Sequence, residues 1–188
     1  MLRAKIFLGL IVAIPPCTLA LADDSDFAGG TEVLSLSGGW TQPIRYSEGG
    51  ITSVNFTWGK YLWQNNSLSL DLGGMFAEQP HGNDEVWIGS VGVLARWHFW
   101  NIDRWSIFLD GGGGVSYADD QYPTYRYDGT HFNFYGKVGL GASLELKSRE
   151  YLTGGVRYFH MSNGQIHGKD QNPGQDGLQY WLGLMWTR

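Results

Sequence analysis

The chain has 188 residues and a formal net charge of −5, and it includes 28 Gly, 9 Trp, 10 Tyr and 9 Phe. With acidic residues in excess, there is no basic stripe to neutralise phosphates, which argues against nucleic acid as a partner. Glycine and aromatic residues in short alternating segments are typical of β-barrels that carry aromatic girdles.

The first 22 residues have the features of a secretory signal peptide. Two basic residues precede an apolar run at 6–14, and the segment ends in Ala20-Leu21-Ala22. The run is shorter than the about 20 residues that a membrane-spanning helix needs, and the small-x-small end is typical of a cleavage site. We expect cleavage after Ala22, with Ala20 as the alternative.

Cleavage there changes what the rest of the chain can do. Cys17, the sole cysteine, leaves with the signal, so residues 23–188 can form no disulfide and no thiolate metal site. Two of the 13 Lys and Arg and none of the 18 Asp and Glu are lost, which leaves 11 and 18 and a net charge of −7. No later apolar run is long enough for a transmembrane helix. We expect residues 23–188 to form a single outer-membrane barrel domain.

Eight strands follow in chain order, each near the about 9–11 residues that a tilted strand needs to cross a bilayer. They are expected at 32–41, 51–62, 67–77, 86–99, 104–117, 131–146, 151–163 and 177–187. The connections alternate between long and short. Because long loops face the outside of the cell and short turns the periplasm in such barrels, this alternation supports the strand count.

Apolar and polar residues alternate along these strands, which predicts one apolar and one polar face. In a membrane barrel the apolar face points outward, whereas in a soluble barrel or sandwich it points inward, and alternation alone does not distinguish them. Six charged residues fall on the polar face: Asp71, Arg96, Asp110, Lys137, Glu145 and Arg157. Eight tryptophans near strand ends favour membrane interfaces: Trp58, Trp63, Trp87, Trp97, Trp100, Trp105, Trp181 and Trp186. We therefore predict an all-β fold, an eight-stranded antiparallel transmembrane β-barrel, filled by its own side chains rather than open as a pore.

The seventh predicted strand carries a candidate catalytic pair. His160 and Ser162 lie two residues apart and so share a face with Val156 and Tyr158, the face expected toward lipid. Such spacing lets an imidazole reach a hydroxyl, and serine needs an adjacent general base to act as a nucleophile. A polar pair that merely marks the water interface is the alternative.

A catalytic triad also needs an acid that orients the imidazole. Asp176 opens the eighth predicted strand, which pairs with the seventh, so it is expected near His160; Asp170 in the loop is the competitor. Asn163 offers a side-chain amide that could stabilise an oxyanion.

The segment Tyr158-Phe159-His160-Met161-Ser162-Asn163, followed by Asn172-Pro173-Gly174-Gln175-Asp176, resembles the C-terminal signature of the PagL-type lipid A 3-O-deacylases. Residues 129–134 are also similar to that family's sixth strand. The resemblance implies an outer-membrane enzyme that removes the ester-linked 3-acyl chain of lipid A in lipopolysaccharide without metal or cofactor. It implies Ser162 as nucleophile, His160 as base, Asp176 as acid and Asn163 as oxyanion donor.

Other polar residues give weaker signals. His81, His98, His131 and His167 lack the spacing of a metal cluster and are interpreted as loop or lumen residues. The run Gly111–Gly114 lacks the Lys and helix of a phosphate loop and more simply lets strands approach closely.

Two other functions compete with the esterase. A non-catalytic barrel with an adhesive or structural role would not need His160, Ser162 and Asp176 together, and a soluble exported barrel would bind an apolar ligand. The sequence assigns no substrate-binding residues, and it leaves open whether the barrels form homodimers.

Overall fold

The computed structural model describes residues 26–44, 49–78, 85–123, 129–168 and 172–188. The predicted signal peptide, Asp170 and His81 therefore lie outside the described residues. The strands are β1 (Glu32–Pro43), β2 (Ile51–Trp63), β3 (Asn66–Glu78), β4 (Glu85–Ile102), β5 (Trp105–Tyr122), β6 (Thr130–Lys147), β7 (Glu150–Ser162) and β8 (Gln175–Thr187). Among these residues no helix is long and apolar enough to cross a membrane.

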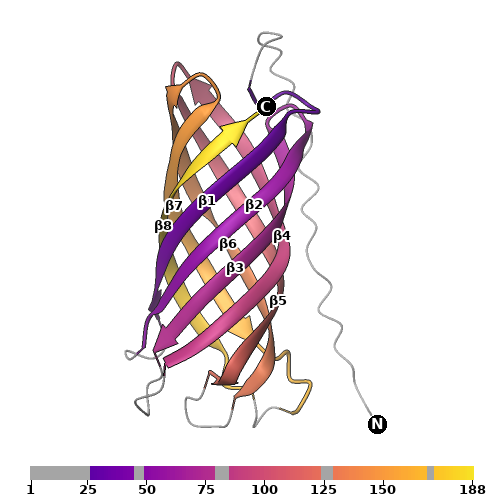
Figure 1. The fold of residues 1–188 in the computed structure, drawn as a ribbon, viewed down its shortest axis with the longest axis vertical. Helices are drawn as coiled ribbons and strands as arrows, with labels where there is room; N and C mark the ends of the chain where they lie inside the picture. Colours follow the sequence, from indigo (N-terminus) through magenta and orange to yellow (C-terminus); the bar gives the residue numbers. More distant parts are fainter. Residues whose placement is uncertain (1–25, 45–48, 79–84, 124–128, 169–171) are drawn as a thin grey trace.

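The eight strands form one closed antiparallel barrel. Each strand pairs with its neighbours in sequence, and β8 closes the ring against β1. Figure 1 shows the strands tilted around a common axis, with the C-terminus at the upper mouth. The predicted fold class and the number of strands are confirmed.

Three two-residue turns join the strands at the mouth that holds the C-terminus. Each contains a residue with positive φ, namely Asn65, Asp103 or Arg149, as tight hairpin turns often require. The ends of β7 and β8 that carry Ser162 and Asp176 lie at the opposite mouth. We call these the turn mouth and the loop mouth.

Most strands are slightly longer than predicted, and β4 and β5 differ most. β5 continues to Tyr122 rather than ending at 117, and its pairing with β6 shifts register between Tyr117 and Tyr122. β4 continues to Ile102 rather than 99. Apolar alternation could not show these extensions, because a register shift interrupts it in each strand, between His98 and Trp100 in β4 and between Tyr117 and Tyr122 in β5.

The apolar face of the barrel points outward. Leu140 and Leu182, in the middle of the wall, are 57% and 60% exposed, an orientation that suits lipid rather than water. The soluble-barrel alternative required the opposite orientation and is therefore wrong.

The interior contains charges in the middle and apolar side chains toward each mouth. Asp110 pairs with Arg96 and Arg157, and Asp71 pairs with Lys137. Of the six charges predicted for the lumen only Glu145, near the turn mouth, is not buried. Apolar clusters lie around Phe159 and Met161 and around Phe27 and Tyr61.

One tryptophan was assigned to the wrong environment. Trp181 is 7% exposed and lies inside the barrel, where the Arg157 guanidinium is 4.1 Å from its ring centroid. The reason is its position in β8: it shares the inward face of Gln179, whereas its neighbours Tyr180 and Leu182 point outward.

Candidate active site

The register of β7 and β8 brings His160 directly opposite Asp176. β8 begins at Gln175, one residue before Asp176, so the carboxylate sits on a paired strand rather than in the loop. On its other side His160 faces Gly136 of β6, which presents no side chain. The pairing therefore determines where the imidazole and the carboxylate meet.

His160 makes two hydrogen bonds. Its Nδ1 lies 2.7 Å from Asp176 Oδ1, and its Nε2 lies 3.1 Å from Ser162 Oγ. A carboxylate can only accept, so Nδ1 carries the proton and Nε2 presents its lone pair to the serine hydroxyl. The order acid, imidazole, hydroxyl is the one that a general base needs to activate a serine.

The three side chains differ in exposure. The His160 side chain is 44% exposed, whereas that of Asp176 is 7% exposed and Ser162 is 9% exposed. The imidazole can thus be reached from the outer wall of the barrel, while the carboxylate that orients it is shielded from competing water.

Tyr158 is a contact that sequence reasoning missed. Its hydroxyl donates to Asp176 Oδ1 at 2.5 Å, so the same oxygen accepts from both Tyr158 and His160. The sequence could have indicated this contact, because Tyr158 precedes His160 by two residues and therefore lies on the same face of the strand.

The chain after Ser162 forms a compact turn. The Gly164 N–H donates to Ser162 Oγ at 3.4 Å, and Gly164 has a φ of +65°, a conformation that favours glycine. The side-chain oxygen of Asn163 accepts from the Gln165 N–H at 2.9 Å, so the other end of the amide is the NH₂ donor.

The start of the loop is connected to its end by a second asparagine. The Asn163 N–H donates to Asn172 Oδ1 at 3.0 Å. Two residues later Gly174 has a φ of +60°, and a Cβ built there would lie 3.8 Å from the His160 ring. In the sequence Asn172 is only part of the motif that carries the family resemblance, and no local pattern predicts its contact with the backbone of Asn163, nine residues earlier.

The structure thus brings together Ser162, His160 and Asp176, with Asn163 following the serine. The other histidines that the structure describes lie elsewhere. His98 is in the lumen, bonded to Tyr61 and Ser106, and His131 and His167 lie at the loop mouth. Within the described ranges no group of three or more His, Cys, Asp or Glu residues is arranged to hold a metal ion.

Comparisons with known proteins give one family and several solved structures that share the barrel fold. The family model described as lipid A 3-O-deacylase (PagL) matches residues 46–184. The crystal structure of the outer membrane enzyme PagL is similar with a TM-score of 0.64 and 17% identity, over 79% of this chain and 97% of that one.

Two further solved barrels are also similar. Neisserial surface protein A has a TM-score of 0.62 and 15% identity, over 84% of this chain and 97% of its own. The outer membrane protein OprG from Pseudomonas aeruginosa has a TM-score of 0.53 and 12% identity, over 88% and 99%. No curated protein matches the chain. At these identities the solved structures support the transmembrane barrel fold alone.

Proposed function

Because the chain belongs to the lipid A 3-O-deacylase (PagL) family, we propose that it hydrolyses the ester-linked 3-acyl chain of lipid A in lipopolysaccharide through Ser162, His160 and Asp176. The observation that carries this proposal is the continuous series of hydrogen bonds from Asp176 through His160 to Ser162. The enzyme is then a serine esterase, a carboxylic ester hydrolase that works in the bacterial outer membrane after export.

The proposed reaction has two steps. Ser162 Oγ attacks the acyl carbonyl as His160 Nε2 takes its proton; the tetrahedral intermediate then collapses, and the sugar 3-hydroxyl leaves with that proton. Water, deprotonated by His160, next attacks the acyl-serine and releases the fatty acid. Asp176 keeps the imidazole in the required tautomer throughout.

The negative charge of the intermediate needs hydrogen-bond donors. We assign the side-chain amide of Asn163 to this role, supported by its position after the serine and by its oxygen being engaged by Gln165. The Gly164 N–H is a second candidate, because it already points at Ser162 Oγ.

The position of the site suits a membrane substrate. His160 lies on the outward face of β7, in line with Val156 and Tyr158, which are 41% and 42% exposed. Lipid A in the surrounding leaflet can therefore bring its ester to the serine by lateral diffusion. A site facing the lumen would require the lipid to leave the bilayer.

The test is mass spectrometry of lipid A incubated with purified protein in detergent. The wild-type protein should release one 3-acyl chain and Ser162→Ala should release none. Ser148→Ala, which changes an exposed serine at the turn mouth, is the matched control and should behave as wild type. Unchanged lipid A with the wild type would favour the non-catalytic adhesive or structural barrel, and equal release by Ser162→Ala would reject Ser162 as nucleophile.

A further inference from the structure

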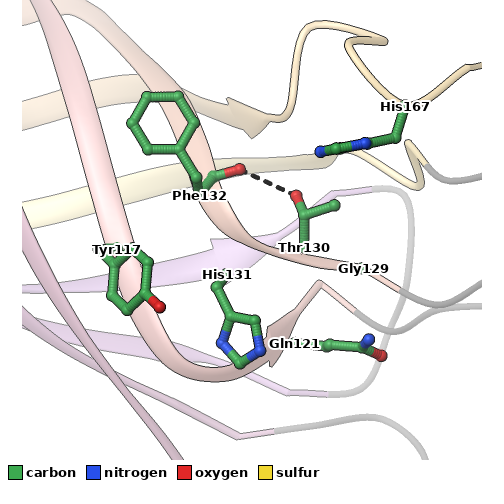
Figure 2. A pocket seen from close by; sticks show the side chains of 7 residues that line it. All are labelled: Tyr117, Gln121, Gly129, Thr130, His131, Phe132 and His167. Atoms are coloured by element: carbon green, nitrogen blue, oxygen red, sulfur yellow. Dashed lines mark hydrogen bonds between the residues drawn. The ribbon is translucent and has the colours of Figure 1, made fainter.

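A hollow of about 360 Å³ lies at the loop mouth, the end of the barrel that also carries Ser162. Its side chains come from β5, from β6 and from the chain between β7 and β8: Tyr117, Gln121, Thr130, His131, Phe132 and His167. Figure 2 shows His167 on one side, with Thr130 and Phe132 next to it and Tyr117 and His131 farther across. Tyr117 is 63% exposed and Phe132 42%, so the hollow opens on the outer wall.

Two phenylalanines connect this hollow to Ser162. Phe134 is the β6 partner of Ser162, and Phe132, which lines the hollow, is two residues closer to the loop mouth. Their ring centroids are 5.3 Å apart, and the strand rise places the two positions about 7 Å apart along β6. The hollow therefore begins about one side chain beyond the serine, on the side away from the middle of the wall.

The lining has the chemistry of a site for neutral hydroxyl groups. His131 Nδ1 donates to the Ala118 carbonyl at 3.0 Å, so its Nε2 is an acceptor in the neutral ring. The ring also stacks on Tyr117, with centroids 5.8 Å apart. The lining residues that the structure describes provide polar and aromatic surface, and none of them is Lys or Arg.

We propose that this hollow binds a glucosamine ring of the lipid A headgroup and so sets which ester reaches Ser162. This inference rests on the proposed function. The acyl chains of lipid A lie in the bilayer and its sugars at the surface, which matches an apolar wall on one side of Ser162 and a polar, aromatic hollow on the other. Sugar hydroxyls would donate to His131 Nε2 and meet the polar groups of Thr130 and His167.

Binding can be measured separately from catalysis in a Ser162→Ala background. Calorimetric titration in detergent compares lipid A with phosphatidic acid, which has acyl chains and phosphate but no sugar. Adding His131→Ala and His167→Ala should raise the Kd for lipid A about tenfold, because two hydrogen bonds of ordinary strength are lost. The Kd for phosphatidic acid should change less than twofold.

Two controls separate the sugar site from a general loss of binding. Lys147→Ala removes an exposed polar side chain at the turn mouth and should leave both Kd values unchanged. His167→Ala alone, in an exposed turn, should give a smaller rise for lipid A and guards against misfolding of the double variant. Equal weakening for both lipids, or none for lipid A, would overturn the sugar site. Failure of the proposed function would instead appear as intact lipid A after incubation with the wild-type protein.

Discussion

At the scale of single residues, Asp176 Oδ1 accepts hydrogen bonds from both Tyr158 and His160. A carboxylate with one donor can rotate about its side-chain bonds, whereas a second donor on the same oxygen restricts it. Tyr158 is thus placed to position the acid without touching the reacting atoms.

Removing the Tyr158 hydroxyl should therefore lower turnover rather than substrate binding. Tyr158→Phe should reduce kcat for lipid A by about tenfold, since a hydrogen bond to a charged group contributes about 1.5–3 kcal/mol and about 1.4 kcal/mol corresponds to a factor of ten. KM should stay within about twofold, because lost positioning acts on the transition state. Steady-state kinetics in detergent measures both constants.

Tyr180→Phe is the matched control, because Tyr180 is also an outward-facing tyrosine, on the neighbouring strand, 49% exposed. It should leave kcat unchanged. The positioning role is rejected if both phenylalanine variants have the same kcat, or if Tyr158→Phe changes KM alone.

At the scale of the strands, glycines allow β4, β5 and β6 to approach closely. A Cβ at Gly113 would lie 2.7 Å from the Tyr135 carbonyl oxygen, and one at Gly114 would collide with the Val91 carbonyl. Gly111, in the same run, has open space around its Cβ position. A Cβ at Gly112 would likewise collide with the Val93 carbonyl oxygen, so the prediction that this run permits close approach applies to Gly112–Gly114 and not to Gly111.

Replacing glycine by alanine, which adds one methyl group, should affect the stability of the barrel differently at Gly114 and Gly111. Gly114→Ala should destabilise the barrel by about 1–3 kcal/mol, because backbone or partner strand must shift to relieve the overlap. Gly111→Ala should be neutral or slightly stabilising, as glycine inside a strand is unfavourable. Urea unfolding in detergent, followed by tryptophan fluorescence, compares them. Similar midpoints for the two variants would show that the strands move apart without cost.

At the scale of the whole molecule, the buried ions connect strands beyond those that pair directly in the sheet. Asp110 on β5 pairs with Arg96 on β4 and with Arg157 on β7. Arg157 lies on the inward face of the strand whose outward face carries His160. The network thus supports the strand from inside, opposite the proposed site.

Neutralising the shared carboxylate should weaken the whole barrel. Asp110→Asn leaves two buried guanidinium groups without a full counter-charge, and breaking a buried pair in this way costs about 3–5 kcal/mol. Glu150→Gln, which disrupts the exposed pair with Lys147, should cost less than about 1 kcal/mol. Equilibrium unfolding in urea measures both, and an equal loss of stability would mean that water already screens the interior pair.

The sequence by itself determined the strand count, the closed antiparallel fold and the spacing of His160 and Ser162, because the period of two in a strand is a local property of the chain. It also indicated the family through the residues around Ser162 and Asp176. Alternation alone did not decide which face points outward, since both orientations alternate alike, and the charges on the polar face and the tryptophans favoured the orientation toward lipid. The closed barrel confirmed that orientation by placing Asp110 inside and Leu140 outside, and it alone placed Trp181 inside.

The contacts of the site depended on the tertiary structure because they join residues from different strands. Which residue of β8 faces His160 is a matter of register, and the pairing that sets it extends along the full length of two strands. The hollow at the loop mouth combines β5 and β6 with His167, about 35 residues further along the chain than His131. No local sequence pattern predicts that these side chains line one hollow, because their proximity depends on how the whole barrel closes.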